Sequence, residues 1–235
     1  MRYFGGKGTI AEPICEMINQ WMKPGQGFLE PFVGSAWIVR NVAAKHRFAS
    51  DTNPYLIAMY QALQKGWVPP THFSEDEYKA LKEEPDTDPA LAGFIGHFCS
   101  FGGMWFQGIA KDAKKHNYIK MAAKTVLKMA QDIWGVDFRC KSYDEWKPKN
   151  AFIYCDPPYA DTGQAYFSTQ FDSEKFWDTM RKWSENNIVI ISEYKAPDDF
   201  KCIAEYRVRM KLNTEMRTEK VYSKHAYDPF GGIFK

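Results

Sequence analysis

The stretch AFIYCDPPY, residues 151–159, joins a short apolar run to an acid, two prolines and a tyrosine. A continuous apolar run such as Ala151 to Cys155 is typical of a strand buried on both faces of a parallel sheet. Pro157 and Pro158 lack backbone N–H donors and favour a stiff, extended turn. We therefore expect a buried strand that ends in a rigid turn beginning at Asp156.

Two earlier segments also place an acid where an apolar strand stops. Residues 27–32 (GFLEPF) predict a short buried strand containing Glu30, and residues 47–50 (RFAS) predict a second strand that stops at Asp51. Open α/β sheets bind ligands beyond the carboxyl ends of their strands, so these two acids and Asp156 are expected to share one cleft. The alternative for each acid taken alone is an ordinary strand-end or helix-cap role.

Hydrophobic periodicity predicts the remaining elements of an α/β fold. Residues 10–22 and 174–184 have helical spacing, and a helix after the first strand is predicted from Ile38, Val39, Val42 and Ala43 as its inner face. Residues 188–192 (IVIIS) predict a further buried strand. Weaker strands near 203–212 and 219–226 predict an antiparallel pair.

The composition changes between residues 64 and 135. This region contains an acidic stretch, a stretch rich in glycine and aromatic residues, and a basic amphipathic stretch, with no strand alternation. We therefore expect one α/β domain, made of residues 1–63 and 136–235, that is interrupted by a mostly helical insertion over 64–135.

Composition and charge exclude several classes of protein. Hydrophobic residues make up 45% and charged residues 26% of the 235 residues, as in ordinary globular proteins. The net charge of +2 excludes nucleic-acid binding by overall charge alone, although it is compatible with a local basic face. We expect no membrane span and no signal peptide, because no apolar run is long enough. Five scattered cysteines without C-x-x-C spacing predict reduced thiols and no zinc site.

The turn after residue 155 carries groups suited to an exocyclic amine on a flat heterocycle. The Asp156 side chain and the Pro157 carbonyl can accept hydrogen bonds from the two amine hydrogens, and Tyr159 can stack on the ring. A plain surface turn is the alternative, and the buried strand that precedes the turn disfavours it.

The loop after the first strand has features of a nucleotide-type cofactor site. Gly34 allows the backbone to pass close to a ligand. Asp51 follows Glu30 by 21 positions (51 − 30), near the ~20-residue offset of the acid that binds ribose hydroxyls in dinucleotide folds. The chain has neither a G-x-G-x-x-G motif nor a P-loop, which argues against NAD and ATP.

Taken together and in order, these motifs resemble those of the Dam-like, α-group DNA adenine-N6 methyltransferases that depend on S-adenosylmethionine. The resemblance covers nearly the whole chain through segments 3–7 (YFGGK), 30–35 (EPFVGS), 51–53 (DTN), 138–143 (FRCKSY), 156–159 (DPPY) and 191–192 (IS). It implies a Rossmann-like methyltransferase sheet flanked by helices, with a target-recognition insertion over 64–135.

The resemblance also implies a reaction. A cytoplasmic enzyme, of a bacterial host or of a phage-infected cell, would transfer a methyl group from S-adenosyl-L-methionine to adenine N6 and leave S-adenosyl-L-homocysteine. The adenine would first be flipped out of double-stranded DNA. Neither a metal nor a membrane is required, and a monomer is compatible with the sequence. The implied catalytic residues are Asp156, Pro157 and Tyr159. The implied cofactor-binding residues are Tyr3, Lys7, Glu30, Phe32, Gly34, Asp51 and Asp156.

Candidate DNA contacts lie in the insertion. Glycines there allow close approach, aromatic rings can enter a base stack and lysines can pair with phosphates. The candidate residues are Trp105, Lys111, Lys114, Lys115 and Asn117. Lys120, Lys124 and Lys128 recur every four residues, which suits either phosphate contact or a solvated helix face. Residues 166–171 (YFSTQF) form either a lid over the flipped base or a plain loop.

Three other functions and two departures from the family pattern are weighed against this hypothesis. The alternatives are an rRNA adenine-N6 methyltransferase, a cytosine-N4 methyltransferase and a catalytically inactive DNA-binding module of the same fold. The insertion disfavours the first, and Asp156, where cytosine-N4 enzymes usually carry serine, disfavours the second. Ala36 stands where the family commonly has a second glycine, and Lys141 replaces an acid. For Ala36 we expect an altered loop and a retained cofactor.

Overall fold

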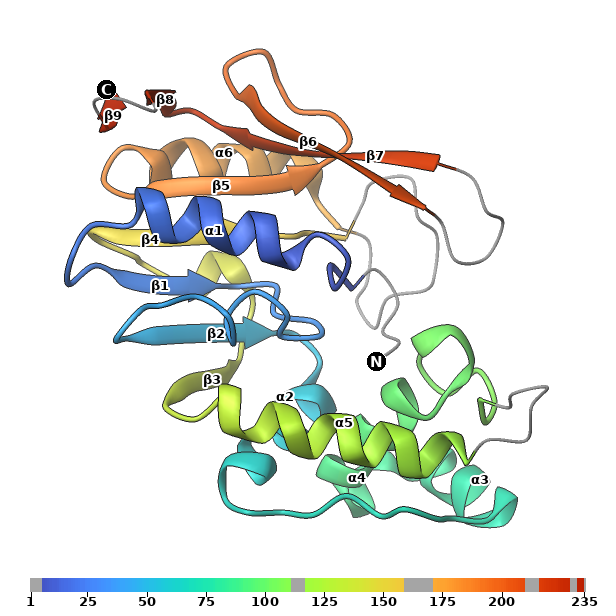
Figure 1. The fold of residues 1–235 in the computed structure, drawn as a ribbon. Coiled ribbons are helices and arrows are strands. Elements are labelled where there is room, and N and C mark those ends of the chain that lie inside the picture. The colour runs from blue at the N-terminus through green and yellow to red at the C-terminus, as the bar shows by residue number, and fades with distance from the viewer. Residues whose placement is uncertain (1–5, 111–116, 159–170, 210–215, 229–231, 235) are drawn as a thin grey trace.

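The structure, a computed structural model, describes the chain except for residues 1–5, 111–116, 159–170, 210–215, 229–231 and 235 (Figure 1). Among the described residues, seven strands form one sheet in the order β3-β2-β1-β4-β5-β7-β6. These strands are β1 (Gly27–Glu30), β2 (Arg47–Asp51), β3 (Val136–Cys140), β4 (Ala151–Cys155), β5 (Ile188–Glu193), β6 (Lys201–Arg209) and β7 (Met216–Ser223). A separate pair consists of β8 (Ala226–Asp228) and β9 (Gly232–Phe234).

The strand order places a topological switch point at β1 and β4. β1 pairs in parallel with both β2 and β4, and the outer pairs β2–β3 and β4–β5 are also parallel. β7 lies antiparallel between β5 and β6. The order 3-2-1-4-5 is that of doubly wound α/β folds, whose ligands bind beyond the carboxyl ends of the strands at such a point. The predicted α/β fold with a flanked, Rossmann-like sheet is therefore confirmed.

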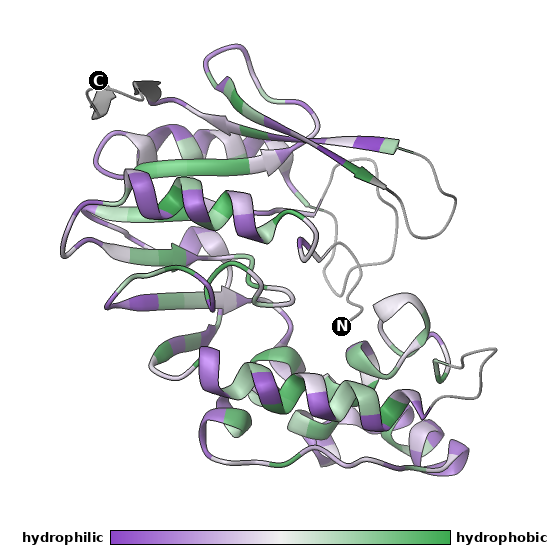
Figure 2. Ribbon diagram, viewed as in Figure 1, coloured by the Kyte–Doolittle hydropathy of each residue, from purple (hydrophilic) through white to green (hydrophobic). Residues whose placement is uncertain are grey.

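Helices cover both faces of the sheet because the strand residues alternate between two apolar clusters. In β4, Phe152 and Tyr154 belong to one cluster, and Ile153 and Cys155 belong to the other. The first cluster includes residues of α1 (Ala11–Trp21), α2 (Pro54–Gln64) and α5 (Tyr118–Asp132), and the second includes residues of α6 (Ser173–Ser184). Figure 1 shows α1 in front of the sheet and α6 behind β5, and Figure 2 shows hydrophobic colour along β5.

The elements predicted from periodicity are present, with one exception. α1, α6 and the strands β4 and β5 lie where the sequence predicts them, and β6 and β7 form the predicted antiparallel pair. The exception is the predicted helix after β1, where the described backbone forms turns. Ile38, Val39 and Val42 are buried as expected, but Ala43 is exposed.

The turns after β1 exist because the Glu30 side chain replaces a helical hydrogen-bond acceptor. The Val39 N–H donates to Glu30 Oε2 over 2.7 Å, whereas in an α-helix it would donate to the carbonyl of Ser35. Ala36 also adopts the left-handed conformation, with a φ of 55° that no helix interior tolerates. The predicted helix is therefore wrong, although its buried apolar positions are right.

Residues between α2 and β3 are mostly helical and share the core of the sheet. They form α3 (Glu75–Glu83), α4 (Pro89–Gly93), a π-helix at Phe94–Phe98, 3-10 turns at Pro85–Thr87 and Phe101–Gly103, and then α5. A capping box at Ser74 begins α3. Phe94 and Met129 from this region lie in the same apolar cluster as Phe28 of β1.

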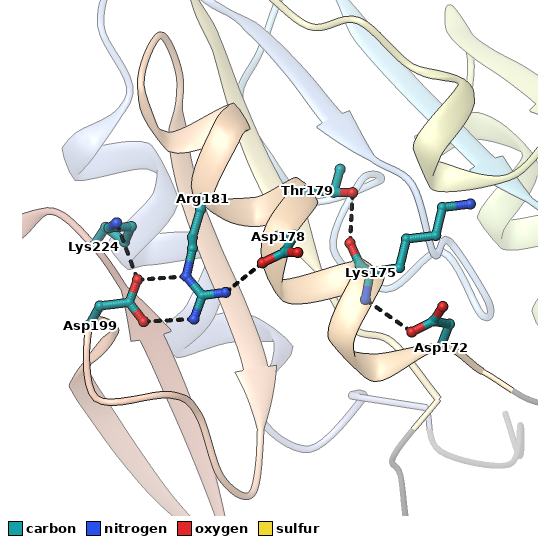
Figure 3. A network of polar contacts seen from close by, with 7 residues as sticks. All are labelled: Asp172, Lys175, Asp178, Thr179, Arg181, Asp199 and Lys224. Atoms are coloured by element: carbon teal, nitrogen blue, oxygen red, sulfur yellow. Dashed lines mark hydrogen bonds and ion pairs between the residues drawn. The ribbon is translucent and has the colours of Figure 1, made fainter.

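An exposed ionic network connects α6 to the segments around β6 and β7 (Figure 3). The Arg181 guanidinium donates to both carboxylate oxygens of Asp199, at 2.9 and 3.0 Å, and to Asp178 at 2.8 Å. Lys224, beyond β7, lies 3.2 Å from the same Asp199 carboxylate. The hydrogen bond from Arg181 lowers the pKa of Asp199 to about 2. Exposed pairs of this kind contribute little to stability because water screens them.

The described part of the chain holds no helix that is long and apolar enough to cross a membrane.

Candidate functional site

Four acidic side chains gather at the carboxyl-terminal ends of the parallel strands, a region named the carboxyl edge below. Glu30 ends β1, Asp51 ends β2, Asp156 follows β4 and Glu193 ends β5. β7 runs antiparallel, so Glu219 in its first half lies beside the end of β5. The sheet topology therefore brings together carboxylates from five strands that are far apart in the sequence.

A buried lysine compensates part of this negative charge. The Lys7 side chain is 6% exposed, and its Nζ lies 2.9 Å from Asp156 Oδ1 and 3.2 Å from Glu219 Oε2. Burial alone would lower the pKa of Lys7, but the nearby carboxylates of Asp156 and Glu219 outweigh it and raise the pKa above its ordinary value. Lys7 is therefore a charged ammonium held between two acids.

Glu30 is a buried acid that accepts a backbone hydrogen bond and has a raised pKa. It is 3% exposed and accepts the Val39 N–H described above. Burial raises the pKa of Glu30 well above its ordinary value, against the effect of the hydrogen bond from Val39, and the charges of Asp156 and Asp51 raise it further. Glu30 thus joins the acidic edge while it holds the loop after β1 in place.

Asp51 ties the cofactor-type loop to the end of β2. Its Oδ2 accepts the N–H of Gly34 at 3.1 Å, and its Oδ1 accepts the N–H of Asn53 at 3.0 Å. Burial raises the pKa of Asp51, and the backbone hydrogen bonds partly oppose this rise. A carboxylate offers about four lone-pair sites, so Asp51 keeps acceptor capacity for a ligand hydroxyl beside its backbone contacts with Gly34, Thr52 and Asn53. Tyr60 fixes the other side of the loop by donating its hydroxyl to the Gly34 carbonyl at 2.6 Å.

Aromatic rings pack beside this loop. Phe32 is half-buried and stacks on Tyr143, with ring centroids 5.2 Å apart. Its edge also meets Phe176 of α6 and Phe171, at centroid distances of 5.8 and 6.1 Å. This arrangement puts an apolar surface next to the acidic edge.

The two departures from the family pattern have local explanations. Ala36 is fully buried and holds the left-handed φ that a glycine would adopt without strain. Lys141 lies with its ammonium 4.2 Å over the Trp146 ring, and it donates to the Glu145 carbonyl at 3.2 Å. Trp146 in turn donates its ring N–H to Ser50 in β2 at 2.8 Å.

Part of the predicted site can be placed in the structure. Lys7, Glu30, Gly34, Asp51 and Asp156 meet at the carboxyl edge of the sheet. Pro157 is buried directly after Asp156, and Phe32 lies in the loop that begins at Glu30. Tyr3, Tyr159 and residues 166–170 lie outside the described residues.

The candidate DNA contacts are placed only in part. Lys111, Lys114 and Lys115 lie outside the described residues. Trp105 is half-buried, stacks on Tyr55 at a centroid distance of 5.1 Å and meets the edge of Phe106 at 4.7 Å.

The other candidate DNA contacts of this region lie at the start of α5 and along it. Asn117 is exposed and caps the helix by accepting the Lys120 N–H at 2.9 Å. Lys120, Lys124 and Lys128 are exposed on α5.

Sequence reasoning missed three residues at this edge, namely Glu193, Tyr194 and Glu219. Tyr194 donates its hydroxyl to Glu219 Oε1 at 3.2 Å. Glu193 is half-buried, and burial together with the Asp156 and Glu219 charges raises its pKa to about 7. Glu193 directly follows the IS pair of β5, which could have drawn attention to it. No local signal marks Glu219, because only strand pairing brings β7 beside β5.

The fold and this site define a doubly wound α/β protein with ionisable side chains gathered at the switch point between β1 and β4. The sequence profile of the D12 class N6 adenine-specific DNA methyltransferases matches residues 3–90 and 99–197, which is more than half of the chain. The chain belongs to this family.

Known relatives are similar at low identity. A DNA adenine methylase of Vibrio cholerae is 25% identical over 183 residues, which are 68% of this chain and 64% of the relative, so the chain spans less than two thirds of that protein. A DNA adenine methylase of Salmonella typhimurium is 24% identical over 203 residues, covering 75% of this chain and 70% of the relative. A solved rRNA methyltransferase from Streptomyces viridochromogenes aligns with 92% of this chain and 84% of its own, with 12% identity and a TM-score of 0.40.

Proposed function

We propose that this protein transfers a methyl group from S-adenosyl-L-methionine to N6 of an adenine that has been flipped out of double-stranded DNA. The observation that carries the proposal is the position of Asp156. Its carboxylate follows the buried strand β4 at the switch point, and a buried ammonium from Lys7 holds it at 2.9 Å. Membership of the adenine-specific family supports the choice of base.

The residues at the carboxyl edge suit this cofactor. S-adenosylmethionine carries two cations, an ammonium and a sulfonium, against one carboxylate. Even without Glu30 and Glu193, whose raised pKa values favour the neutral acid, Asp51, Asp156 and Glu219 outnumber Lys7 at this edge. Asp51 sits where ribose hydroxyls are bound in related folds and keeps acceptor capacity. Gly34, at a positive φ of 41°, allows close approach to the backbone. Lys7, Glu30, Phe32 and Tyr3 complete the proposed cofactor site.

When bound, the cofactor supplies an electrophilic methyl group on sulfur. The Asp156 carboxylate and the Pro157 carbonyl accept hydrogen bonds from the adenine amine, which draws the nitrogen lone pair out of conjugation with the ring. Tyr159 stacks on the flipped base and offsets part of the lost stacking, which amounts to a few kcal/mol. Positioning the amine for in-line transfer provides much of the remaining acceleration.

We also propose that two parts of the chain have different functions. Residues 1–63 and 136–235 form the catalytic unit, and residues 64–135 read the DNA. Trp105, Lys111, Lys114, Lys115 and Asn117 are the proposed DNA contacts, with the lysines pairing with phosphates.

Labelled methyl transfer tests the proposal. The purified chain is incubated with methyl-labelled S-adenosylmethionine and with mixed-sequence duplex DNA or ribosomal RNA, and the nucleosides are separated by mass spectrometry. We expect N6-methyladenine in DNA. Label on cytosine, label confined to RNA, or cofactor binding without any transfer would each contradict the proposal and support one of the alternatives.

Asp156→Asn tests the role of the carboxylate. We expect turnover to fall at least about 100-fold, because a neutral amide is a weaker acceptor and brings a donor toward the amine. Asp137→Asn is the matched control, since Asp137 lies on the edge strand β3 and pairs with Arg139. Circular dichroism should show both variants folded. Near-normal turnover by Asp156→Asn would remove the residue from the mechanism.

A further inference from the structure

The Lys7 ammonium at the site is shared by two carboxylates, and only one of them belongs to the DPPY turn. Its Nζ contacts Asp156 Oδ1 at 2.9 Å and Glu219 Oε2 at 3.2 Å. The second oxygen of Glu219, Oε1, accepts the Tyr194 hydroxyl at 3.2 Å. The polar chain therefore runs from Asp156 through Lys7 and Glu219 to Tyr194.

Glu219 and Tyr194 are both held by contacts with the sheet. Glu219 is 8% exposed and lies on β7, which is paired on both sides, with β5 and β6. Tyr194 directly follows β5, where the Tyr222 hydroxyl donates to its carbonyl at 3.1 Å and the Arg217 guanidinium lies 4.2 Å from its ring centre. A flexible lysine side chain is thus held by a carboxylate that is itself fixed by the sheet.

The Glu219 carboxylate restricts the position of the Lys7 ammonium. A buried ammonium facing Asp156 alone would be free to rotate about four side-chain bonds, and lysine loses substantial rotamer entropy when it is held in one geometry. The Glu219 carboxylate gives the ammonium a second, fixed contact and keeps it charged, since Glu219 is among the groups that raise the pKa of Lys7. The direction from which Lys7 meets Asp156 is then set by β7.

We propose that Glu219 is a positioning residue for methyl transfer, which acts through Lys7 to hold the Asp156 carboxylate in the rotamer that receives the adenine amine. The inference rests on the proposed function and adds to it a residue beyond position 197, where the match to the family profile ends. It also gives a role to the buried acid on β7.

Glu219→Gln is the main test, because it keeps the size of the side chain and an acceptor for Tyr194 but removes the charge that fixes Lys7. With saturating duplex DNA and S-adenosylmethionine, we expect kcat to fall about tenfold or more while both KM values change less than about twofold. Glu205→Gln is the matched control. Glu205 lies on the neighbouring strand β6, is exposed and pairs with Lys220 at 3.4 Å, so its loss should leave kcat unchanged.

A double-variant cycle tests whether Glu219 acts through Lys7. Glu219→Gln is combined with Lys7→Met, and single-turnover rates are compared with those of the two single variants. We expect Glu219→Gln to slow the reaction much less in the Lys7→Met background than in the wild type. Equal slowing in both backgrounds would overturn the inference.

The outcomes also separate this inference from the proposed function. If neither the wild type nor Glu205→Gln methylates adenine N6, the proposed function fails. If both do so and Glu219→Gln is as fast, the positioning role fails. Should Glu219→Gln be unfolded at the assay temperature, Tyr194→Phe removes only one hydroxyl contact, and we expect it to lower kcat about twofold to threefold. An unchanged kcat in Tyr194→Phe would then overturn the inference.

Discussion

Glu193 illustrates how its place in the sheet changes the chemistry of a single residue. At the end of β5 it is half-buried, and burial raises its pKa to about 7. The hydrogen bond from the Tyr194 N–H at 2.7 Å and the Lys7 charge oppose this rise, whereas the Asp156 and Glu219 charges add to it. Glu193 therefore keeps its proton to a higher pH in the folded protein than in the unfolded chain.

The raised pKa of Glu193 predicts a pH dependence of stability. An acid whose folded pKa lies above its unfolded value stabilises the fold fully below the unfolded pKa, about 4.5, and loses this contribution as the pH rises through about 7. Glu193→Gln cannot ionise. We expect the melting temperature of the variant, relative to the wild type, to increase between pH 5 and pH 8 in thermal unfolding followed by circular dichroism.

Glu16→Gln, at an exposed position on α1, is the control for this experiment. Its melting temperature should follow that of the wild type across the same range. Parallel curves for Glu193→Gln and the wild type would contradict the assigned pKa. Glu30 and Asp51, whose pKa values are also raised, contribute equally to both proteins and do not affect the comparison.

At the scale of elements, the contact between α2 and α4 depends on one glycine. A Cβ added at Gly93 would lie 2.1 Å from the Tyr55 carbonyl oxygen and 3.1 Å from the Met59 side chain. A backbone oxygen cannot move aside as a flexible side chain does, so the two helices would have to separate. Both helices supply residues to the first apolar cluster, and the separation would disturb it.

Gly93→Ala should therefore destabilise the protein by about 1–3 kcal/mol or more in urea denaturation. Gly27→Ala is the matched control, because a Cβ at Gly27 would meet the Phe48 side chain at an ordinary 3.8 Å. We expect this control to change the free energy of unfolding by less than about 1 kcal/mol. Equal effects of the two substitutions would show that the close helix contact does not limit stability.

At the scale of the whole molecule, the proposed DNA binding would have to come from local basic regions. The net charge of +2 gives no general attraction, so phosphate contacts by the insertion would dominate affinity. We expect affinity for duplex DNA to fall at least about tenfold between 50 and 200 mM salt in fluorescence anisotropy titrations. A flat response would contradict a phosphate-binding insertion.

A triple substitution locates this electrostatic contribution. Replacing Lys111, Lys114 and Lys115 with glutamine should weaken binding. It should also reduce the slope of log affinity against log salt concentration by about 2 to 3, which corresponds to the loss of about two to three phosphate contacts. The control replaces three exposed lysines that precede β1, β2 and β4, at the opposite edge of the sheet: Lys23, Lys45 and Lys149. This control should retain the slope of the wild type.

The amino-acid sequence by itself determined the buried strands, the α/β class and the position of three acids at the carboxyl ends of β1, β2 and β4. Five apolar residues before Asp156, and shorter runs before Glu30 and Asp51, are local patterns whose structural meaning depends little on the rest of the chain. The proposed role of the DPPY segment likewise depends on residues that are adjacent in the sequence.

Only the tertiary structure decided the turns after β1 and the network around Lys7. The spacing of Ile38, Val39 and Val42 predicts a helix. The hydrogen bond that the Val39 N–H donates to the side chain of Glu30, at the end of β1, overrides that preference. Glu219 stands 63 positions beyond Asp156 (219 − 156), and only the antiparallel insertion of β7 between β5 and β6 brings it to Lys7. Periodicity reports which face of an element is buried, whereas contacts between distant strands depend on strand order, which no local pattern encodes.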